Sequence, residues 1–283
     1  MSIPIIDTHL HIWDLEKVEY SWLRGNKSVL ARTYLPEEVL PFMQKVGVTQ
    51  AILIQAANTI EETEFMLDAA QQHPWIQGVV GWLPLLDPAA TQKQIQIFQQ
   101  NKYFKGVRHL VHDEVNAEWL LQPAVLESLQ ILADHKIPYE VVGVKASHLK
   151  AAIHIAQTIP DLSMMLDHLV NPPISDVHLF PEWETLMKQV SQCSNVYAKI
   201  SGLGTQVKKG DAWEAADIQS YIEFALNHFG VERCVCGGDW PVALLASNYV
   251  KTMRAYRDVI ENFLTSEDQA KVFHSNATLF YSL

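Results

Sequence analysis

Eight short apolar segments, each followed by a longer stretch of helical character, constrain the fold of this chain more than any other feature. Most of the segments are rich in β-branched residues and lack the polar alternation of a strand with one wet face. We therefore expect strands buried on both faces of a parallel sheet, at Ile3–His9, Val48–Gln55, Gln77–Leu83, Gly106–Leu110, Pro138–Val142, Ser163–His168, Val196–Ile200 and Cys234–Asp239.

Helix boundary signals lie between these segments. Pro36 begins a predicted helix that Gly47 ends, Pro123 stands in the first turn of a helix running towards His135, and Pro181 begins a later one. Eight β-then-α units predict an α/β protein, a single-domain (β/α)8 TIM barrel over residues 1–283. An open doubly wound sheet fits the same alternation, but the unit count matches the barrel and no glycine-rich nucleotide loop follows the first strand.

Charge and cysteine content narrow the partners and the location. The formal net charge of −11 argues against nucleic acid or an acidic membrane as a partner. Three cysteines without a framework of spacings do not indicate a disulfide-stapled secreted fold, and Cys234 and Cys236 are expected to be small core residues. With no signal-peptide pattern and no apolar run of membrane-spanning length, the sequence predicts a cytoplasmic protein.

The first strand ends in Asp-Thr-His-Leu-His, which places His9 and His11 two residues apart. Side chains two apart on an extended chain point the same way, so these imidazoles can converge on one point. Imidazole is a strong ligand for zinc and similar ions, and two of them supply half of a coordination shell. The alternative is a pair of hydrogen-bonded, inert histidines at the start of a loop.

Two further titratable residues end other strands. His168 ends the sixth predicted strand and can act as a ligand or a base, although a core or capping histidine is the plainer interpretation. Asp239 follows the eighth strand before Pro241, where it can bind a metal or take a proton from water, or simply cap a helix. All of these residues fall at strand C-termini, where barrel enzymes build their active sites, so the pattern favours an enzyme.

Charged residues within the strand candidates need partners. Arg108 can anchor a carboxylate or polarise a carbonyl, with an ion pair to Asp113 or Glu114 as the structural alternative. Glu140 and Lys199 would each be costly if unpaired inside a barrel. They can satisfy one another across it, which would be a structural role rather than a catalytic one.

Tryptophans follow or end several of the strand candidates, at Trp13, Trp22, Trp82 and Trp240. Aromatic rings at a pocket suit a sugar-like or ring-shaped ligand, although loop tryptophans also pack against helices. We expect substrate contacts from Trp13 and Trp240 only.

Six segments together resemble, in order and over nearly the whole chain, the lactonase branch of the amidohydrolase superfamily. They are IDTHLHIWD, FKGVRHLVHDE, LDHLVNPPI, AKISGL, GGDWPV and NATLFY. That branch includes sugar lactonases acting on fucono- and rhamnono-lactones and the 2-pyrone-4,6-dicarboxylate lactonases. The resemblance implies a barrel hydrolase that opens a cyclic ester.

Matching the motifs residue by residue carries several roles onto this chain. The resemblance implies that the possible metal ligands and catalytic residues are His9, His11, His168 and Asp239, and that the substrate-binding GVRH segment is represented by Arg108 and His109. The chain departs from the pattern at Asn171, where a lysine is usual, and at Gly238, where serine often precedes the aspartate. These departures bear on substrate contacts and leave the ligand set intact.

The resemblance also bears on the metal. No counterpart of the superfamily's metal-bridging lysine stands at the end of the fourth strand, which argues against a binuclear site. One divalent ion, with zinc preferred, is expected. Metal-independent catalysis stays an alternative, because the pyrone lactonases are regarded as working without metal.

The predicted mechanism has Asp239 take a proton from water, while the three histidines, directly or through a metal, and Arg108 stabilise the oxyanion. Few arginines are placed to pair a dicarboxylate, so a neutral sugar lactone, and a place in carbohydrate metabolism, are preferred. The alternatives are a 2-pyrone-4,6-dicarboxylate lactonase, a metal-dependent non-oxidative decarboxylase on the same scaffold, and a barrel that binds a small molecule without turnover.

Overall fold

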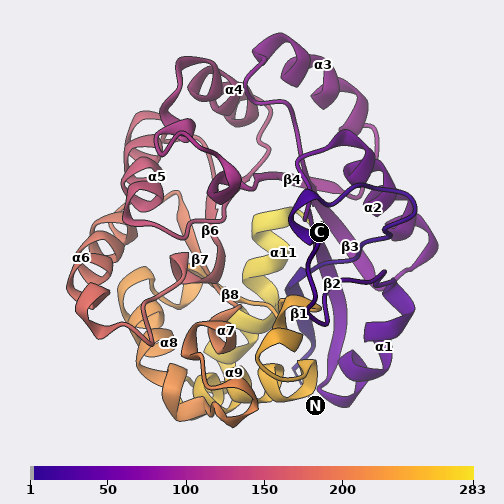
Figure 1. The fold of residues 1–283 in the computed structure, drawn as a ribbon. Coiled ribbons are helices and arrows are strands. Elements are labelled where there is room, and N and C mark those ends of the chain that lie inside the picture. The colour runs from indigo at the N-terminus through magenta and orange to yellow at the C-terminus, as the bar shows by residue number, and fades with distance from the viewer. Residues whose placement is uncertain (1–2) are drawn as a thin grey trace.

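The computed structural model describes residues 3–283, and its centre is one eight-stranded parallel sheet in the order β1 to β8 (Figure 1). Almost every residue in these strands is buried, as expected for strands covered on both faces. The strands are β1 Ile5–Leu10, β2 Val48–Ile54, β3 Ile76–Gly81, β4 Phe104–His109, β5 Tyr139–Val141, β6 Met164–Leu166, β7 Val196–Ile200 and β8 Cys234–Cys236.

Helices surround the sheet and connect consecutive strands, as Figure 1 shows. They are α1 Pro36–Lys45, α2 Ile60–Gln72, α3 Pro88–Phe98, α4 Pro123–Asp134, α5 Ala146–Thr158, α6 Phe180–Ser191, α7 Leu203–Val207, α8 Ala215–Phe229, α9 Tyr249–Phe263, α10 Ser266–Ala270 and α11 Asn276–Tyr281. This architecture confirms the predicted (β/α)8 barrel, and the predicted proline starts at Pro36 and Pro123 are observed. None of the helices within residues 3–283 has the length and apolar character needed to cross a membrane.

The barrel closes between β8 and β1. Leu10 and Trp240 form a parallel bridge, with the N–H of His11 donating to the Trp240 carbonyl at 2.7 Å. The N–H of Asp239 donates to the His9 carbonyl, also at 2.7 Å. Closure therefore brings the ends of the first and last strands together, although they lie more than two hundred residues apart in the chain.

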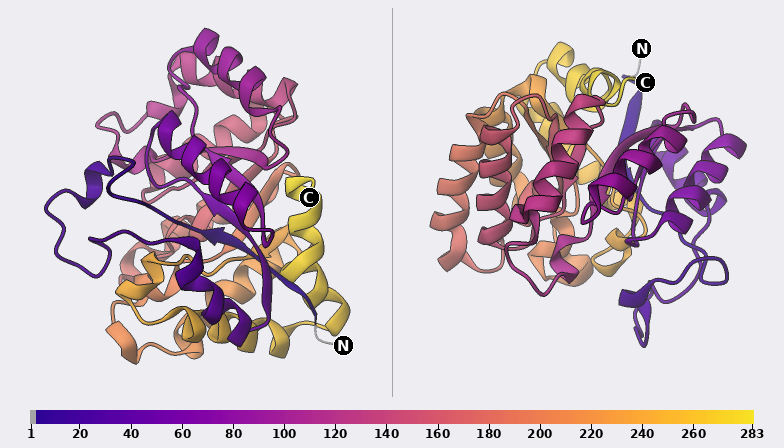
Figure 2. Two further views of the ribbon diagram at one scale, coloured as in Figure 1. Left: turned by 90° about the vertical axis from the view of Figure 1, so that its right-hand side faces the viewer. Right: turned by 90° about the horizontal axis from the view of Figure 1, so that it is seen from above.

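The two ends of the barrel differ. At one end α11 lies across the opening, and its Ala277, Phe280 and Tyr281 pack with inward residues of the strands such as Ile6 and Val235. The left view of Figure 2 shows the indigo loop after β1 projecting from the opposite side, the side towards which the strand arrows point. The C-terminal ends of the strands are thus left open to a cavity, which is where the site lies.

Candidate active site

A cavity of about 370 Å³ opens at the C-terminal ends of the strands. Its polar floor includes His11, Arg108, His168 and Asp239. Its walls are largely apolar and come from the loops, with the long loop after β1 contributing residues such as Trp22. A concave, mostly apolar site with a few convergent polar groups has the usual character of a small-molecule site.

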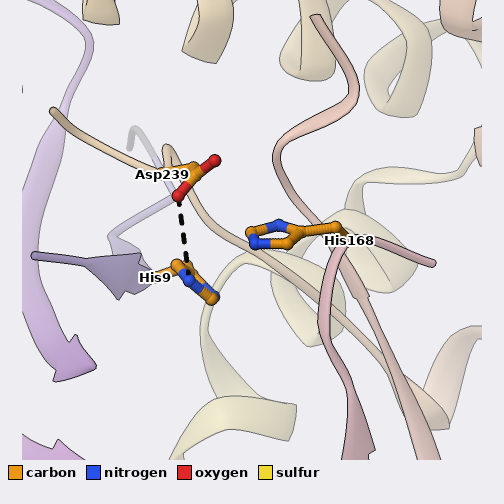
Figure 3. Close-up of side chains that lie close together, drawn as sticks. All are labelled: His9, His168 and Asp239. Carbon is orange, nitrogen blue, oxygen red and sulfur yellow. Dashed lines mark ion pairs between the residues drawn. The ribbon is translucent and has the colours of Figure 1, made fainter. Parts of the chain in front are cut away.

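Four of the predicted residues lie close together at this floor. His9 Nε2 lies 3.2 Å from His11 Nε2, and Asp239 Oδ1 lies 3.8 Å from His9 Nε2 and 3.4 Å from His11 Nε2. The His168 ring lies 4.4 Å from the His9 ring, centroid to centroid. Figure 3 shows His9, His168 and Asp239 turned towards one another, with the contact between His9 and Asp239 dashed. Strands β1, β6 and β8 supply these groups, as the sequence predicted.

The atoms that meet here are all acceptors in the neutral rings. His11 Nδ1 lies 2.7 Å from the Ile54 carbonyl, which only accepts, so Nδ1 carries the proton and Nε2 a lone pair. His9 Nε2 lies 3.2 Å from Nη1 of Arg108, which only donates, so this nitrogen also accepts. Within residues 3–283 Asp239 Oδ1 has no hydrogen-bond donor.

This donor set fits a cation. Two nitrogen lone pairs and a carboxylate oxygen at these distances repel one another unless a proton or a metal ion lies between them. Ligand atoms of His9, His168 and Asp239 lie within 4.8 Å of one another, which is close enough to share one ion. Imidazole and carboxylate are the ligands of catalytic zinc sites, so the residues present suit one divalent ion.

His9, which is buried, and His168, which is half-buried, are held in the neutral form that a metal needs. Burial lowers the pKa of His9 well below its usual value, although Asp167 acts in the opposite direction. Burial also lowers the pKa of His168, against the effect of Asp239 and Asp167. A neutral imidazole has a free lone pair, so each ring can act as a ligand at neutral pH.

His168 reaches the site because its backbone leaves the strand. It has a φ of 54° and begins a run of four residues with positive φ that ends at Asn171. Its Nδ1 lies 2.8 Å from Ser201 Oγ, which fixes the ring. Gly202 lies directly beneath, where a Cβ would be 2.5 Å from His168 Nδ1. The absence of a side chain at Gly202 therefore leaves the room that the imidazole occupies.

Hydrogen bonds to Asp7 hold the turn that carries Asp239 against β1. Asp7 Oδ1 accepts from the N–H groups of His9 at 2.9 Å and Gly238 at 2.8 Å, and its Oδ2 accepts from the Tyr249 hydroxyl at 2.7 Å. Burial raises the pKa of Asp7 to about 6, against the effect of these hydrogen bonds. The alternative of Asp239 as a helix cap is wrong, because the short 3₁₀ helix that follows has no side-chain cap.

Arg108 spans the middle of the site. It donates through Nε to Gln55 Oε1 at 3.1 Å, through Nη2 to the Gln55 carbonyl, and through Nη1 to Asp167 Oδ2 at 2.9 Å. Its ion-pair partner is therefore Asp167 rather than the Asp113 or Glu114 considered from the sequence. The predicted pairing of Glu140 with Lys199 is confirmed.

The buried carboxyl groups in this part of the barrel have opposite pKa shifts. Burial alone would raise the pKa of Asp167, but Lys199, His9 and Arg108 hold it well below its usual value. Burial raises the pKa of Glu140 to about 8, although Lys199 acts in the opposite direction. Both carboxyl groups contact Lys199, and the additional contact of Asp167 with Arg108 accounts for the opposite direction of its shift.

The remaining predicted substrate residues are placed differently from one another. Trp13 lines the cavity and donates from Nε1 to the Arg32 carbonyl at 2.6 Å. Trp240 packs edge-on against Tyr34, and it is not among the residues that line the cavity. His109 likewise faces away from the cavity, where it stacks on Trp119 and its Nε2 donates to Glu114 at 2.7 Å. Its predicted role in binding substrate stays a prediction.

Several residues of the site were not predicted. Gln55, Asp167, Ser201 and Gly202 fix Arg108, His9 and His168, and Trp22 lines the cavity, yet none of them was given a role from the sequence. Asp167 had a usable signal, because it is a carboxylate next to a candidate ligand at the end of an apolar strand. The others carry no signal of their own, since only the folded backbone shows what they face.

Comparison with known proteins agrees with this geometry. The family model described as amidohydrolase matches residues 6–283. An L-fucono-1,5-lactonase of Burkholderia ambifaria is 27% identical over 281 residues, covering 98% of this chain and 95% of the relative. A crystal structure of an amidohydrolase from Burkholderia multivorans with bound zinc, 26% identical, superposes with a TM-score of 0.90 over 99% of both chains.

A more distant structure shares the fold alone. The probable 2-pyrone-4,6-dicarboxylic acid hydrolase of Acinetobacter baumannii, with bound citric acid, is 15% identical and has a TM-score of 0.73 over 99% of both chains. The family model covers nearly the whole chain, and the residues that meet at the cavity floor are those expected from the motifs. The chain therefore belongs to the amidohydrolase family.

Proposed function

We propose that this protein hydrolyses a neutral sugar lactone, with Asp239 as the base that takes a proton from the attacking water. The observation that carries the proposal is the position of Asp239 Oδ1, which lies at the cavity floor among the histidines and has no hydrogen-bond donor within residues 3–283. A carboxylate oxygen without a hydrogen-bond donor can bind a cation, accept a proton from a water molecule, or both. The curated lactonase relatives support the same reaction class.

One divalent ion, with zinc preferred, would be held by His9, His11, His168 and Asp239. When bound, such an ion supplies Lewis-acid polarisation of the lactone carbonyl and lowers the pKa of a coordinated water. The zinc found in the Burkholderia multivorans structure supports this choice. The other contributions come from the chain itself: Asp239 accepts the proton, and Arg108 and the histidines orient the reacting groups.

The charge of the cavity favours a neutral substrate. Arg108 is the one lysine or arginine among the described residues that line the cavity, and its guanidinium is already bound by Asp167 and Gln55. Two other arginines near the first loop point elsewhere, because Arg24 pairs with Glu19 and Arg32 with Glu38. A pyrone dicarboxylate would enter without a free cation to pair its two charges.

The test is acid release from a panel of aldono-1,4- and 1,5-lactones, including L-fucono-1,5-lactone, and from a pyrone dicarboxylate, each with and without chelator. Carbon dioxide release from aromatic acids is measured in parallel. Hydrolysis of a sugar lactone that falls at least about 100-fold in kcat in Asp239→Asn supports the proposal. Near-normal turnover in that variant, or carbon dioxide release without any lactonase activity, refutes it.

Chelator sensitivity then decides the metal. We expect activity to be lost with chelator and restored by zinc, and chelator-resistant turnover would favour the metal-independent alternative. A cytoplasmic location, a place in carbohydrate metabolism and the lack of a nucleic-acid partner stay predictions from the sequence.

A further inference from the structure

A series of buried polar side chains crosses the barrel from α11 to the active site. The Tyr281 hydroxyl donates to Glu140 Oε1, and Lys199 Nζ donates to Glu140 Oε2. Lys199 Nζ also lies 2.9 Å from Asp167 Oδ1, and that oxygen lies 3.5 Å from His9 Nδ1. Glu140, Lys199 and Asp167 are 0% exposed, so water cannot replace any of these contacts.

Stability does not account for this series of buried polar side chains. The interior of a (β/α)8 barrel is usually filled by branched apolar side chains, and Ile6, Ile52 and Val235 do fill the neighbouring part of this one. Each ion moved out of water costs several kcal/mol, and well-packed apolar replacements of a buried ion pair are often neutral or stabilising. Some other property of the molecule must benefit from Glu140 and Lys199.

The contacts at Asp167 indicate that this property is the orientation of Asp167 towards His9. Arg108 Nη1 binds Oδ2 at 2.9 Å, and Lys199 binds Oδ1, so the carboxylate is held at both oxygens. In this orientation Oδ1 lies 3.5 Å from Nδ1 of His9, and this contact, together with the Arg108 Nη1 that donates to Nε2, favours the tautomer with the proton on Nδ1. The His9 lone pair is then on Nε2, the nitrogen that faces His11 and Asp239.

Each further residue of this series restrains the neighbour that lies nearer to His9. Lys199 has a flexible stem with a point charge at its end, and Glu140 Oε2 accepts from the ammonium group that contacts Asp167. The Tyr281 hydroxyl donates to the other oxygen of Glu140, which restrains that carboxyl group. The last helix of the chain thus contacts the site through three intermediate side chains.

We propose that Lys199, Glu140 and Tyr281 are positioning residues, which orient Asp167 and through it fix the tautomer of His9 and its affinity for a divalent ion. They touch neither the cavity nor the reacting groups. The inference rests on the proposed function only for its activity measurement, because metal affinity and tautomer are read without a lactone.

The decisive variant is the double replacement Glu140→Leu with Lys199→Met, which removes the carboxyl and ammonium groups and leaves an apolar pair. We expect this variant to fold with a lowered melting temperature, because the buried Tyr281 hydroxyl loses its acceptor and Asp167 loses one cation. Zinc affinity should fall about 10- to 100-fold, measured by competition with a chromogenic chelator. Turnover should fall with it. The matched control, Lys150→Met with Glu182→Leu, breaks an exposed ion pair of the same type and should change neither quantity.

The His9 ring itself gives a second readout. In metal-free protein labelled with ¹⁵N-histidine, the nitrogen shifts should report a proton on Nδ1 in the wild type. They should report a partial shift towards the other tautomer in the double variant, in which Arg108 still donates to Nε2. Tyr281→Phe, which removes one hydroxyl group, should show the same changes at smaller amplitude.

The outcomes separate the possibilities. A folded double variant with wild-type zinc affinity and an unchanged His9 tautomer overturns the inference. If the double variant does not fold, Tyr281→Phe decides by the same two measurements. If the wild type binds zinc and hydrolyses no lactone, the proposed function fails while the positioning role is still tested.

Discussion

Gly202→Ala tests whether the space beneath His168 matters for activity. Gly202 has a φ of +62°, and an added Cβ would lie 2.5 Å from His168 Nδ1 and 3.1 Å from Asp239 Oδ2. Alanine in the left-handed region costs about 1–2 kcal/mol in stability. Since ordinary contacts begin at 3.4 Å, the ring must move by about 1 Å, and a displacement of about 1 Å at a catalytic group can lower the rate about 100-fold.

Gly210→Ala is the matched control. Gly210 also has a positive φ, +52°, but a Cβ there would meet nothing within 4 Å. We expect both variants to lose about 1–2 kcal/mol in the free energy of unfolding, measured by urea denaturation, from the backbone alone. Only Gly202→Ala should also lose zinc affinity and about 100-fold in kcat on the best lactone.

The reasoning is refuted if Gly202→Ala shows only the backbone loss of about 1–2 kcal/mol and keeps wild-type turnover, because the ring would then have moved without consequence. It is equally refuted if Gly210→Ala loses the same activity, because the loss would then come from backbone strain and not from the collision with His168.

Two further predictions follow from the same structure. His9→Asn should change how the free energy of unfolding depends on pH in the metal-free protein. Below about pH 6.5 His9 takes up a proton in the unfolded wild type. In the folded protein buried His9 stays neutral at this pH, because its pKa lies well below its usual value. The wild type should therefore lose up to about 1.4 kcal/mol per pH unit relative to the variant as the pH falls, and parallel stability curves would contradict this. Trp22→Ala should raise KM about 5- to 50-fold and leave kcat nearly unchanged, because the ring lines the cavity wall away from the reacting groups; a fall in kcat of the same size would place Trp22 in the chemistry.

The sequence predicted the barrel well because its alternation of apolar strands and helices is a local property. All eight predicted strands overlap observed ones, but the sixth and eighth are shorter than expected. β6 ends at Leu166 and β8 at Cys236, and the chain then turns through the positive-φ residues His168 and Asp239. The sequence favours a strand as far as His168 and Asp239, but the backbone must leave the strand for these side chains to point into the site.

The candidate site was predicted less completely, for a physical reason. Residues His9 and His11 belong to one strand end, and their spacing alone indicates that they converge. The partners of Arg108 and Lys199 come from other strands, and pairing with Asp167 follows only from the register of the closed barrel. A search for the partner of Arg108 nearby in the sequence could not succeed, because that partner lies 59 residues away.

Strand geometry explains why only Arg108 of the neighbours Arg108 and His109 faces the site. It also explains why both Asp167 and His168 reach it. In β4 adjacent side chains point to opposite faces, so Arg108 can face the barrel interior only if His109 faces outward to Trp82 and Trp119. After β6 both neighbours reach the site, Asp167 from the end of the strand and His168 from a left-handed backbone.

That left-handed run is costly, and its cost indicates its purpose. Left-handed conformation costs about 1–2 kcal/mol for each residue other than glycine, and four such residues stand in succession from His168 to Asn171. Two hydrogen bonds hold the run, one from Trp183 Nε1 to the Leu169 carbonyl and one from the Asn171 N–H to the His168 carbonyl, both at 2.9 Å. These bonds offset part of the cost without explaining why the backbone turns. The turn is explained by the two roles that one strand end must supply, a carboxylate behind His9 and an imidazole beside it.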